Sequence, residues 1–290
     1  MKYLKEYIKE GLFDNIDKLE GKNGLESNSK QLKKEIVDWI CSHYFDSPSF
    51  AKSRAIKKSA LTVNTSTTPP TVNYNGQGRS PCIYITTNTD SLCNNGMFQW
   101  GEFEGCFDCS YCKSLTTLEG APEKVGGDFK CNGCKLLKTL EGAPEKVGWS
   151  FSCTECHSLT SLKGAPKEIN MSFYCNYCKS LKTLEGAPEE IGGFFNCMDC
   201  PKLTSLKGAP KKVGSFRVGP WLDPNCSLTS LEGGPKEVRE DFNCSLCNSL
   251  KTLEGGPKVV GGDFKCYSCG TKFTEEDVKK VSNVKRKIYC

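Results

Sequence analysis

Cysteine is the residue type in this chain with the greatest capacity for chemistry, with 20 cysteines among 290 residues. Many of them form Cys-x-x-Cys pairs, such as Cys131 with Cys134 and Cys153 with Cys156. These two pairs are separated by 18 residues, a spacing that is typical of four-cysteine zinc sites. The same thiols could instead form disulfides or fill small apolar sites in a core. Which of these three roles the cysteines have depends on the secondary structure that carries the pairs.

The pairs recur because a 22-residue unit recurs along the chain. Each unit contains a leucine followed, after one residue, by Gly-Ala-Pro or Gly-Gly-Pro. The step between units is 22 residues throughout, with one exception of 25 residues between the fifth and sixth leucines. A fixed period in this range predicts a solenoid, in which each turn packs on its neighbours. The repeated leucines are Leu118, Leu140, Leu162, Leu184, Leu206, Leu231 and Leu253.

The unit reads Leu-x-x-Leu-x-Gly-x-Pro-x-x-Val-x-x-x-Phe-x-Cys-x-x-Cys-x-x. Alternate residues of a strand point to the same face, so the Phe-x-Cys step predicts a short strand with its phenylalanine and first cysteine facing inward. The glycine and proline positions predict turns on either side. Because no segment of the unit has room for a helix, we expect the turns to stack into a parallel sheet with strands about 4.8 Å apart.

This geometry favours the cysteines as core residues. The repeat period by itself accounts for the zinc-like spacing, and a buried free cysteine behaves as a small hydrophobic residue. Zinc binding would require thiols from adjacent turns to converge on a tetrahedron again and again along the stack. Disulfides between equivalent cysteines would have nearly parallel Cβ vectors, which is poor geometry. We therefore predict no metal and no other cofactor, and keep a multi-zinc protein as an alternative.

The unit resembles the leucine-rich repeat, whose signature is Leu-x-x-Leu-x-Leu-x-x-Asn/Cys-x-Leu. Phe129 and Cys131 match its two strand leucines, and Cys134 matches its Asn/Cys position. The chain departs from the signature by one extra residue before the strand and by Cys-x-x-Leu in place of Asn-x-Leu. Asn225 is expected at the Asn position of the irregular unit. The resemblance implies a mainly β leucine-rich-repeat solenoid with few helices and a protein-binding function.

The rest of the chain divides into two further zones. Residues 1–45 are expected to be helical, because apolar residues recur at steps of three and four, with a break at Gly21–Gly24 and a second helix from near Asn28. Gln31 would complete a capping box there. Residues 46–95 are rich in Ser, Thr, Asn, Pro and Gly, which predicts a linker with little core of its own. The solenoid then occupies residues 96–290.

Both ends of the solenoid carry residues suited to cover it. Phe98, Trp100 and Phe103 can cover the first turn with aromatic rings. In the expected C-terminal cap, residues 270–290, Thr274 is placed to begin a short helix. Ile288–Tyr289 should form a final edge strand, where neighbouring Lys and Arg residues discourage pairing with other sheets.

Comparison of the copies within the chain separates scaffold positions from variable ones. The residue inside Phe-x-Cys and the two residues after the first cysteine differ between copies, and strand alternation turns them outward. A rigid sheet that presents Tyr, Asn, Met and Lys suits recognition of a protein. The alternative is that these positions are only solvated. The predicted partner-binding residues are Lys130, Asn132, Ser152, Thr154, Glu155, Tyr174, Asn176, Tyr177, Asn196, Met198, Asp199, Asn243, Lys265 and Tyr267.

The composition argues against the other classes of function. The chain has only two histidines, His43 and His157, and it has neither a phosphate-binding loop nor a paired-carboxylate arrangement, so we expect no catalysis and no small-molecule substrate. A net charge of +5 is too small to indicate a nucleic-acid partner. No apolar run reaches the length of a membrane span, and charges interrupt the first residues, so a cytoplasmic location is expected.

The first ten residues, Met1–Glu10, are similar to the leader of internal head proteins of tailed bacteriophages. That resemblance implies packaging into the phage head and cleavage after Glu10, which would leave Gly11 as the new N-terminus. The alternative is a plain amphipathic helix. The sequence thus predicts a phage-encoded, non-enzymatic protein-binding module in the host bacterial cytoplasm or the virion. A packaged or structural virion component is the alternative.

Overall fold

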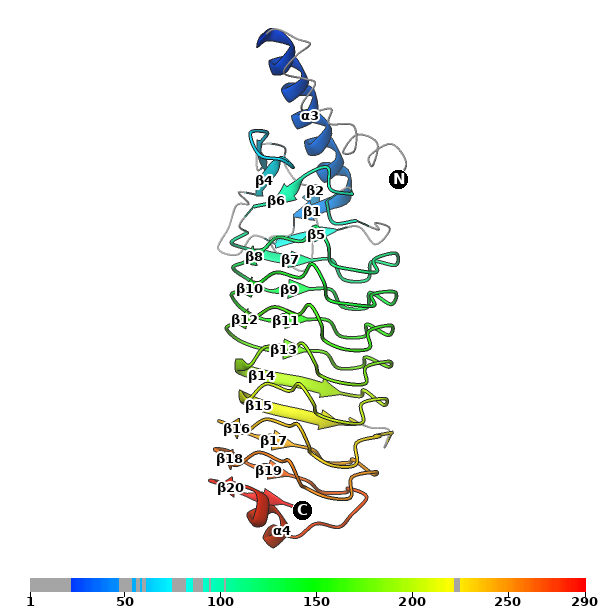
Figure 1. Cartoon of the computed structure of the whole chain (residues 1–290), viewed down its shortest axis with the longest axis vertical. Helices are drawn as coiled ribbons and strands as arrows, with labels where there is room; N and C mark the ends of the chain where they lie inside the picture. Colours follow the sequence, from blue (N-terminus) through cyan, green and yellow to red (C-terminus); the bar gives the residue numbers. More distant parts are fainter. Residues whose placement is uncertain are drawn as a thin grey trace.

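The computed structural model describes residues 22–46, 54–55, 58, 61–74, 82–85, 91–93, 95–101, 103–221 and 225–290. These residues form a long stack of similar turns, with helix α3 (Lys22–His43) at the N-terminal end and the short helix α4 (Glu275–Val281) at the other (Figure 1). The predicted mainly β solenoid with a parallel sheet is confirmed. Within the described residues, neither helix combines the length and the apolar character needed to cross a membrane.

Each regular turn contributes two short strands, one more than the sequence predicts. The first strand lies at the Pro-x-x-Val position, and its copies pair in parallel as β8 (Lys124–Val125), β10 (Lys146–Val147) and β12 (Glu168–Ile169). The second lies at Phe-x-Cys, as in β7 (Cys106–Asp108), β9 (Phe129–Lys130), β11 (Phe151–Ser152) and β13 (Phe173–Tyr174). The valine is buried as deeply as the phenylalanine, which explains why both positions form strands.

The two ladders are joined in the middle of the stack. Strands β14 (Glu190–Met198) and β15 (Lys212–Gly219) are long enough to belong to both. After them the first ladder continues through β16 (Glu237–Val238), β18 (Val259–Val260) and β20 (Asn283–Val284). The second continues through β17 (Phe242–Asn243), β19 (Phe264–Lys265) and β21 (Ile288–Tyr289).

A column of phenylalanine rings runs through the core. Consecutive rings have centroids 5.0 to 5.7 Å apart, and every ring is fully buried. The parallel register sets this spacing, because residues one turn apart lie directly beside each other. Burial of each ring contributes about 1.5–3 kcal/mol of hydrophobic free energy. The column consists of Phe107, Phe129, Phe151, Phe173, Phe195, Phe216, Phe242 and Phe264.

The N-terminal helix differs from the prediction. It begins at Lys22 rather than near Asn28 and ends at His43, so Gly24 lies inside it. Gln31 does not act as a capping-box partner, because its amide donates to the Glu35 side chain at 2.7 Å. Packing of Ile36 and Ile40, both fully buried, favours the longer helix over the local preference of glycine. The first predicted helix and the leader lie outside the described residues.

Several segments between 46 and 95, expected to be a linker, form strands. β3 (Leu61–Asn64) and β4 (Thr71–Tyr74) make an antiparallel hairpin, and β4 also pairs with β6 (Gln99–Trp100). β5 (Cys82–Ile85) pairs in parallel with β7 and antiparallel with β1 (Tyr44–Asp46), which also pairs with β2 (Arg54–Ala55). The open edge of the first turn supplies backbone partners that composition alone does not reveal. The segment thereby extends the sheet.

The predicted caps are present at both ends. At the N-terminal end Phe98, Trp100 and Phe103 are almost fully buried, and Trp100 makes edge-on ring contacts with Tyr44 and Phe107. At the other end Thr274 and Asp277 form a reciprocal capping box at the start of α4. β21 is the last strand of the second ladder, as expected. The caps therefore cover apolar surface that an open stack would expose.

Candidate functional site

The residues between phenylalanine and cysteine form one continuous row along the second ladder, which we call the outer row. The parallel register places each of them directly beside its neighbours one turn away, about 4.8 Å apart. Sequence comparison missed three members. Asp108 had the same signal as the others, Arg217 follows Phe216 in a unit without the cysteine, and Tyr289 follows an isoleucine. The row consists of Asp108, Lys130, Ser152, Tyr174, Asn196, Arg217, Asn243, Lys265 and Tyr289.

The residues after the first cysteine form a second row, and several of them bond neighbouring turns together. Asn132 Oδ1 accepts the backbone N–H of Thr154 at 3.0 Å and the hydroxyl of Ser152 at 2.6 Å. Asn196, in the outer row, accepts the N–H of Met198 at 3.1 Å. Ser152 and Met198 are buried, so these two predicted partner-binding residues offer little surface. The predicted Thr154 and Asn176 are half-buried, and Tyr267 is exposed.

The second residue after the first cysteine of each turn forms a third row, and the backbone at this position has an unusual conformation. Glu155, Tyr177 and Asp199, all predicted site residues, have φ angles of 60°, 61° and 54°. This left-handed region favours glycine, and Gly133 occupies it at the equivalent position of another turn. Side chains are kept in the other turns although glycine would fit the backbone better. Strain of this kind is concentrated at functional positions. The other non-glycine residues in this conformation in the third row are Tyr111, Leu246 and Ser268.

Two predicted lysines of the outer row are already neutralised by carboxylates. Lys130 Nζ lies 3.1 Å from Asp128, and Lys265 Nζ lies 3.0 Å from Asp241. Burial opposes ionisation of Asp241, but hydrogen bonds from the Asp263 N–H and Lys265 bring the pKa of its carboxyl below the ordinary value. Asp108 is the reverse case, since burial raises the pKa of its carboxyl. The outer row therefore contains both lysines that are paired with carboxylates and a carboxyl group that burial makes harder to ionise.

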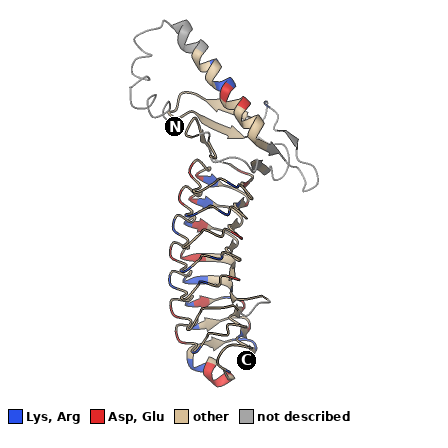
Figure 2. Cartoon of the chain, turned by 90° about the vertical axis from the view of Figure 1, so that its right-hand side faces the viewer, with Lys and Arg blue, Asp and Glu red and all other residues tan. Residues whose placement is uncertain are grey.

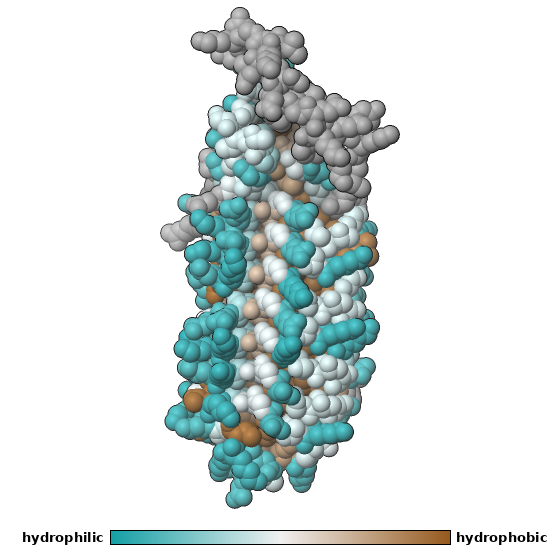
Figure 3. All heavy atoms as spheres, viewed as in Figure 1, coloured by the Kyte–Doolittle hydropathy of each residue, from teal (hydrophilic) through white to brown (hydrophobic). Residues whose placement is uncertain are grey.

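Charge is also balanced on the rest of the surface. Lysines and carboxylates are interspersed along the stack (Figure 2), and some form exposed pairs, such as Lys146–Glu168 at 2.8 Å and Lys211–Glu189 at 2.7 Å. Water screens such exposed pairs, so they contribute little to stability. In the space-filling view, like side chains stand in columns that follow the long axis (Figure 3). The surface is thus a set of parallel columns and not a single charged patch.

The second cysteine of most pairs bonds the backbone of the preceding turn. Cys156 Sγ donates to the carbonyl oxygen of Cys131 at 3.2 Å, and the same bond recurs from Cys134, Cys178, Cys200 and Cys269 at 3.2 to 3.3 Å. Burial raises the pKa of Cys131, so its thiol stays neutral. The cysteines that the structure describes are not joined in disulfides, and nearly all are buried.

In the described part of the chain, no side chains are assembled into a metal site or into a pair of nucleophile and base. No group of three or more His, Cys, Asp or Glu side chains there is arranged to hold a metal ion. Cys156 donates to a backbone carbonyl one turn away, and the adjacent His157 has a buried Nδ1 with no hydrogen-bond partner. These two residues are neighbours in sequence without acting as a pair.

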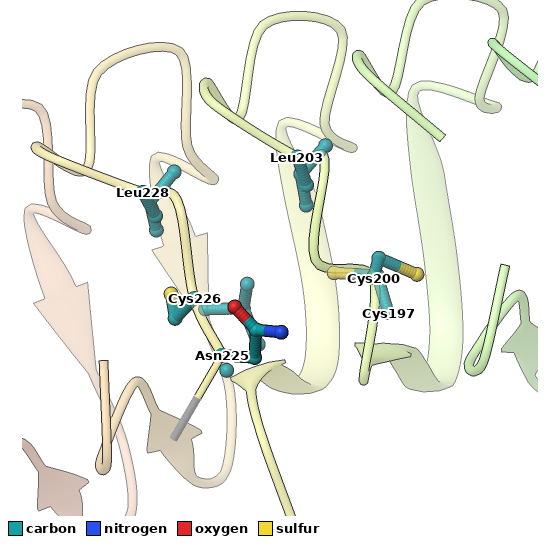
Figure 4. A pocket seen from close by; sticks show the side chains of 8 residues that line it. Cys197, Cys200, Leu203, Asn225, Cys226 and Leu228 are labelled. Atoms are coloured by element: carbon teal, nitrogen blue, oxygen red, sulfur yellow. The ribbon is translucent and has the colours of Figure 1, made fainter. Parts of the chain in front are cut away.

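The irregular 25-residue step also departs from the prediction. Asn225, expected at the Asn position, is exposed, and Cys226 is buried beside it. Cys226, Cys197 and Cys200 line a small internal cavity of about 10 Å³ (Figure 4). This volume corresponds to about one water molecule.

No family model, no curated protein and no solved structure matches the chain. The three rows of side chains lie on the outward side of the second ladder, which we call the Phe-x-Cys face. The geometry of this face is the basis for a functional proposal.

Proposed function

We propose that the chain is a non-enzymatic protein-binding module that recognises a protein partner through its Phe-x-Cys face. The observation that carries the proposal is the outer row, in which chemically different side chains stand at fixed spacing on an invariant core. Repeat proteins commonly use such extended surfaces for binding. The constant interior preserves the scaffold, while the variable exterior gives each turn its own contact.

The scaffold under this face is pre-organised. Its strands are paired on both sides along the stack, and side chains such as Asn132 tie adjacent turns together. A rigid surface loses little conformational entropy when a partner binds. Tyr174 and Tyr177 lie in one turn, and tyrosine is enriched at interfaces because it offers a large contact area with few rotatable bonds. We therefore place the centre of the interface at this turn.

We further propose that the repeats are of the leucine-rich type and that the protein is phage-encoded. The first proposal is supported by the match of Phe129, Cys131 and Cys134 to the repeat signature, and the second by the similarity of residues 1–10 to head-protein leaders. The location follows as the host bacterial cytoplasm or the virion.

The test is affinity capture from host and infected lysates with the full chain and with Tyr174→Ala/Tyr177→Ala. We expect the double variant to recover at least about tenfold less of the partner, because interface tyrosines often contribute more than 1.4 kcal/mol. Lys167→Ala/Lys211→Ala, on the exposed first-ladder side, is the matched control and should retain the partner. Equal recovery by both double variants would remove the Phe-x-Cys face from consideration.

The second candidate, a packaged or structural virion component, is favoured by the unbroken phenylalanine column, which makes the body stiff along its length. Mass spectrometry of purified particles tests it. The expected result is a chain that begins at Gly11, and absence of the protein from particles argues against packaging.

A further inference from the structure

A second cavity, of about 180 Å³, lies on the Phe-x-Cys face where the 25-residue step interrupts the repeat. Its lining includes Arg217 and Asn243 of the outer row and the aromatic side chains of Trp221 and Tyr267. Both rings are available for contact, being 58% and 42% exposed. Pockets for drug-sized ligands have volumes of about 300–1,000 Å³, so this cavity suits a single side chain.

The cavity wall contains the buried hydroxyl of a serine. Ser245 is 4% exposed, and its Oγ makes no hydrogen bond with any residue that the structure describes. In regular turns the equivalent side chains bond an adjacent turn, as Ser110 Oγ does with the N–H of Asn132 at 3.1 Å. The equivalent N–H in the turn that follows Ser245 is that of Tyr267, and it makes no hydrogen bond with Ser245 Oγ. An unpaired buried hydroxyl is costly, which points to a ligand that supplies the missing partner.

Two further donors line the cavity. Arg217 forms no ion pair with the carboxylates of the described residues, and its recorded side-chain contact is with the Phe194 ring, 5.6 Å from Cζ to the centroid. That contact leaves the in-plane N–H groups of the guanidinium free. Asn243 Oδ1 accepts the N–H of Ser245 at 2.9 Å, so its amide nitrogen is left to donate. Lys130 and Lys265 of the same row, in contrast, are paired with aspartates.

Asp241 attracts Arg217 at longer range, but no carboxylate of the described residues lies within ion-pair distance of the Arg217 guanidinium. Asp241 bonds Lys265 at 3.0 Å, and Asp199 Oδ1 accepts the backbone N–H of Trp221 at 3.0 Å. The other oxygen of Asp199 is buried without a partner, but Asp199 is not part of the cavity lining. A guanidinium, an amide N–H and a hydroxyl together match the acceptor oxygens of a carboxylate.

We propose that this cavity takes the carboxylate of an aspartate or glutamate side chain of the protein partner, with Trp221 and Tyr267 packed against its methylene stem. The proposal rests on the proposed function and makes it more specific. Arg217 supplies the charge, Asn243 and Ser245 supply neutral hydrogen bonds, and the aromatic rings exclude water from the contact.

The test is a titration of the full ¹⁵N-labelled chain with two short peptides, N-acetyl-Ala-Glu-Ala-amide and N-acetyl-Ala-Gln-Ala-amide. The reporter is the indole N–H resonance of Trp221, identified by its loss in Trp221→Phe. We expect a saturable shift at millimolar to tens of millimolar glutamate peptide, and about tenfold weaker binding of the glutamine peptide, because a charge-assisted hydrogen bond is lost.

Arg217→Gln should abolish the preference for glutamate, and Ser245→Ala should weaken both peptides. Lys130→Gln removes a cation of the same row that is already paired and should leave the preference unchanged. Equal affinity for the two peptides, no shift of Trp221, or equal affinity for acetate ion and the glutamate peptide would overturn the proposal.

The two tests fail independently. A capture that depends on Tyr174 and Tyr177 together with a failed titration removes the carboxylate pocket and leaves the protein-binding face. A successful titration with no dependence of capture on those tyrosines keeps the pocket and removes the proposed centre of the interface.

Discussion

The thiols of Cys266 and Cys290 lie 3.7 Å apart, on adjacent turns at the C-terminal end of the second ladder. Cys266 is 2% exposed, whereas Cys290 is exposed. Burial raises the pKa of Cys266, so an oxidant reaches Cys290 first. Among the cysteines that the structure describes, this pair therefore combines proximity with access to solvent.

Mild hydrogen peroxide is expected to join this pair before other described cysteines, because one of its thiols is exposed and the two lie 3.7 Å apart, although equivalent positions of adjacent turns are not ideal for a disulfide. The two thiols lose two protons and two electrons to the peroxide, which becomes two waters. Peptide mapping without reductant should detect the Cys266–Cys290 bridge, and Cys290→Ser should abolish it. Cys244 and Cys247, both buried, serve as internal controls that remain reduced. Their oxidation before the terminal pair would contradict the burial shown here.

Removal of one ring from the phenylalanine column should be costly. Phe173 is fully buried between Phe151 and Phe195, with centroids 5.2 and 5.3 Å away. Phe173→Ala should lower the free energy of unfolding by about 3–5 kcal/mol, since it leaves a cavity that the stack cannot close. Urea denaturation measures the change. Leu136→Ala, at a residue that is 50% exposed, is the control and should change stability little.

At the left-handed positions of the third row, a change to glycine should raise the free energy of unfolding, and a change from glycine should lower it. Tyr177→Gly relieves the φ of 61° and should raise the free energy of unfolding by up to about 1 kcal/mol while it weakens partner capture. Gly133→Ala should be destabilising, because a Cβ there would meet the Tyr111 ring at 2.4 Å. A stabilised Tyr177→Gly variant with full partner capture would show that this side chain is only tolerated.

The contributions of Asp108 and Asp241 to folding stability should depend on pH in opposite directions. The raised pKa of Asp108 means that the folded state prefers its protonated form, so this contribution to stability is lost as pH rises above the ordinary value of 3.8. Asp108→Asn should therefore gain stability relative to the parent at neutral pH, and the gain should shrink at acid pH.

The lowered pKa of Asp241 gives the reverse sign. Its contribution is present above pH 3.8 and is lost as pH falls through the lower folded-state pKa. Asp241→Asn should be less stable than the parent at neutral pH and approach it in acid. Thermal melts of the two variants between neutral pH and pH 3 measure both trends, and parallel curves would contradict them.

Zinc content tests the core role of the cysteines. Because the second cysteine of most pairs donates its proton to a carbonyl of the preceding turn, we expect only traces of zinc in protein purified without chelator. Native mass spectrometry or inductively coupled plasma mass spectrometry gives the stoichiometry. Two or more zinc ions per chain would favour the multi-zinc alternative.

The sequence by itself determined the stack and its interior. A period of 22 residues brings Phe129, Phe151 and Phe173 to the same position of successive turns, and strand alternation then turns Lys130, Ser152 and Tyr174 outward. It also determined both caps, because the aromatic residues and the helix start at Thr274 are local signals. These features follow from periodicity, which every copy repeats and reinforces.

Only the tertiary structure decided the features that depend on contacts between different turns or zones. The strands between 46 and 95 form because the first turn offers them an open edge, and Gly24 stays helical because residues further along α3 are packed. The left-handed row and the cavity beside Ser245 have no signature in composition. Their geometry is set by how one turn lies on the next, and a single turn read alone does not contain that information.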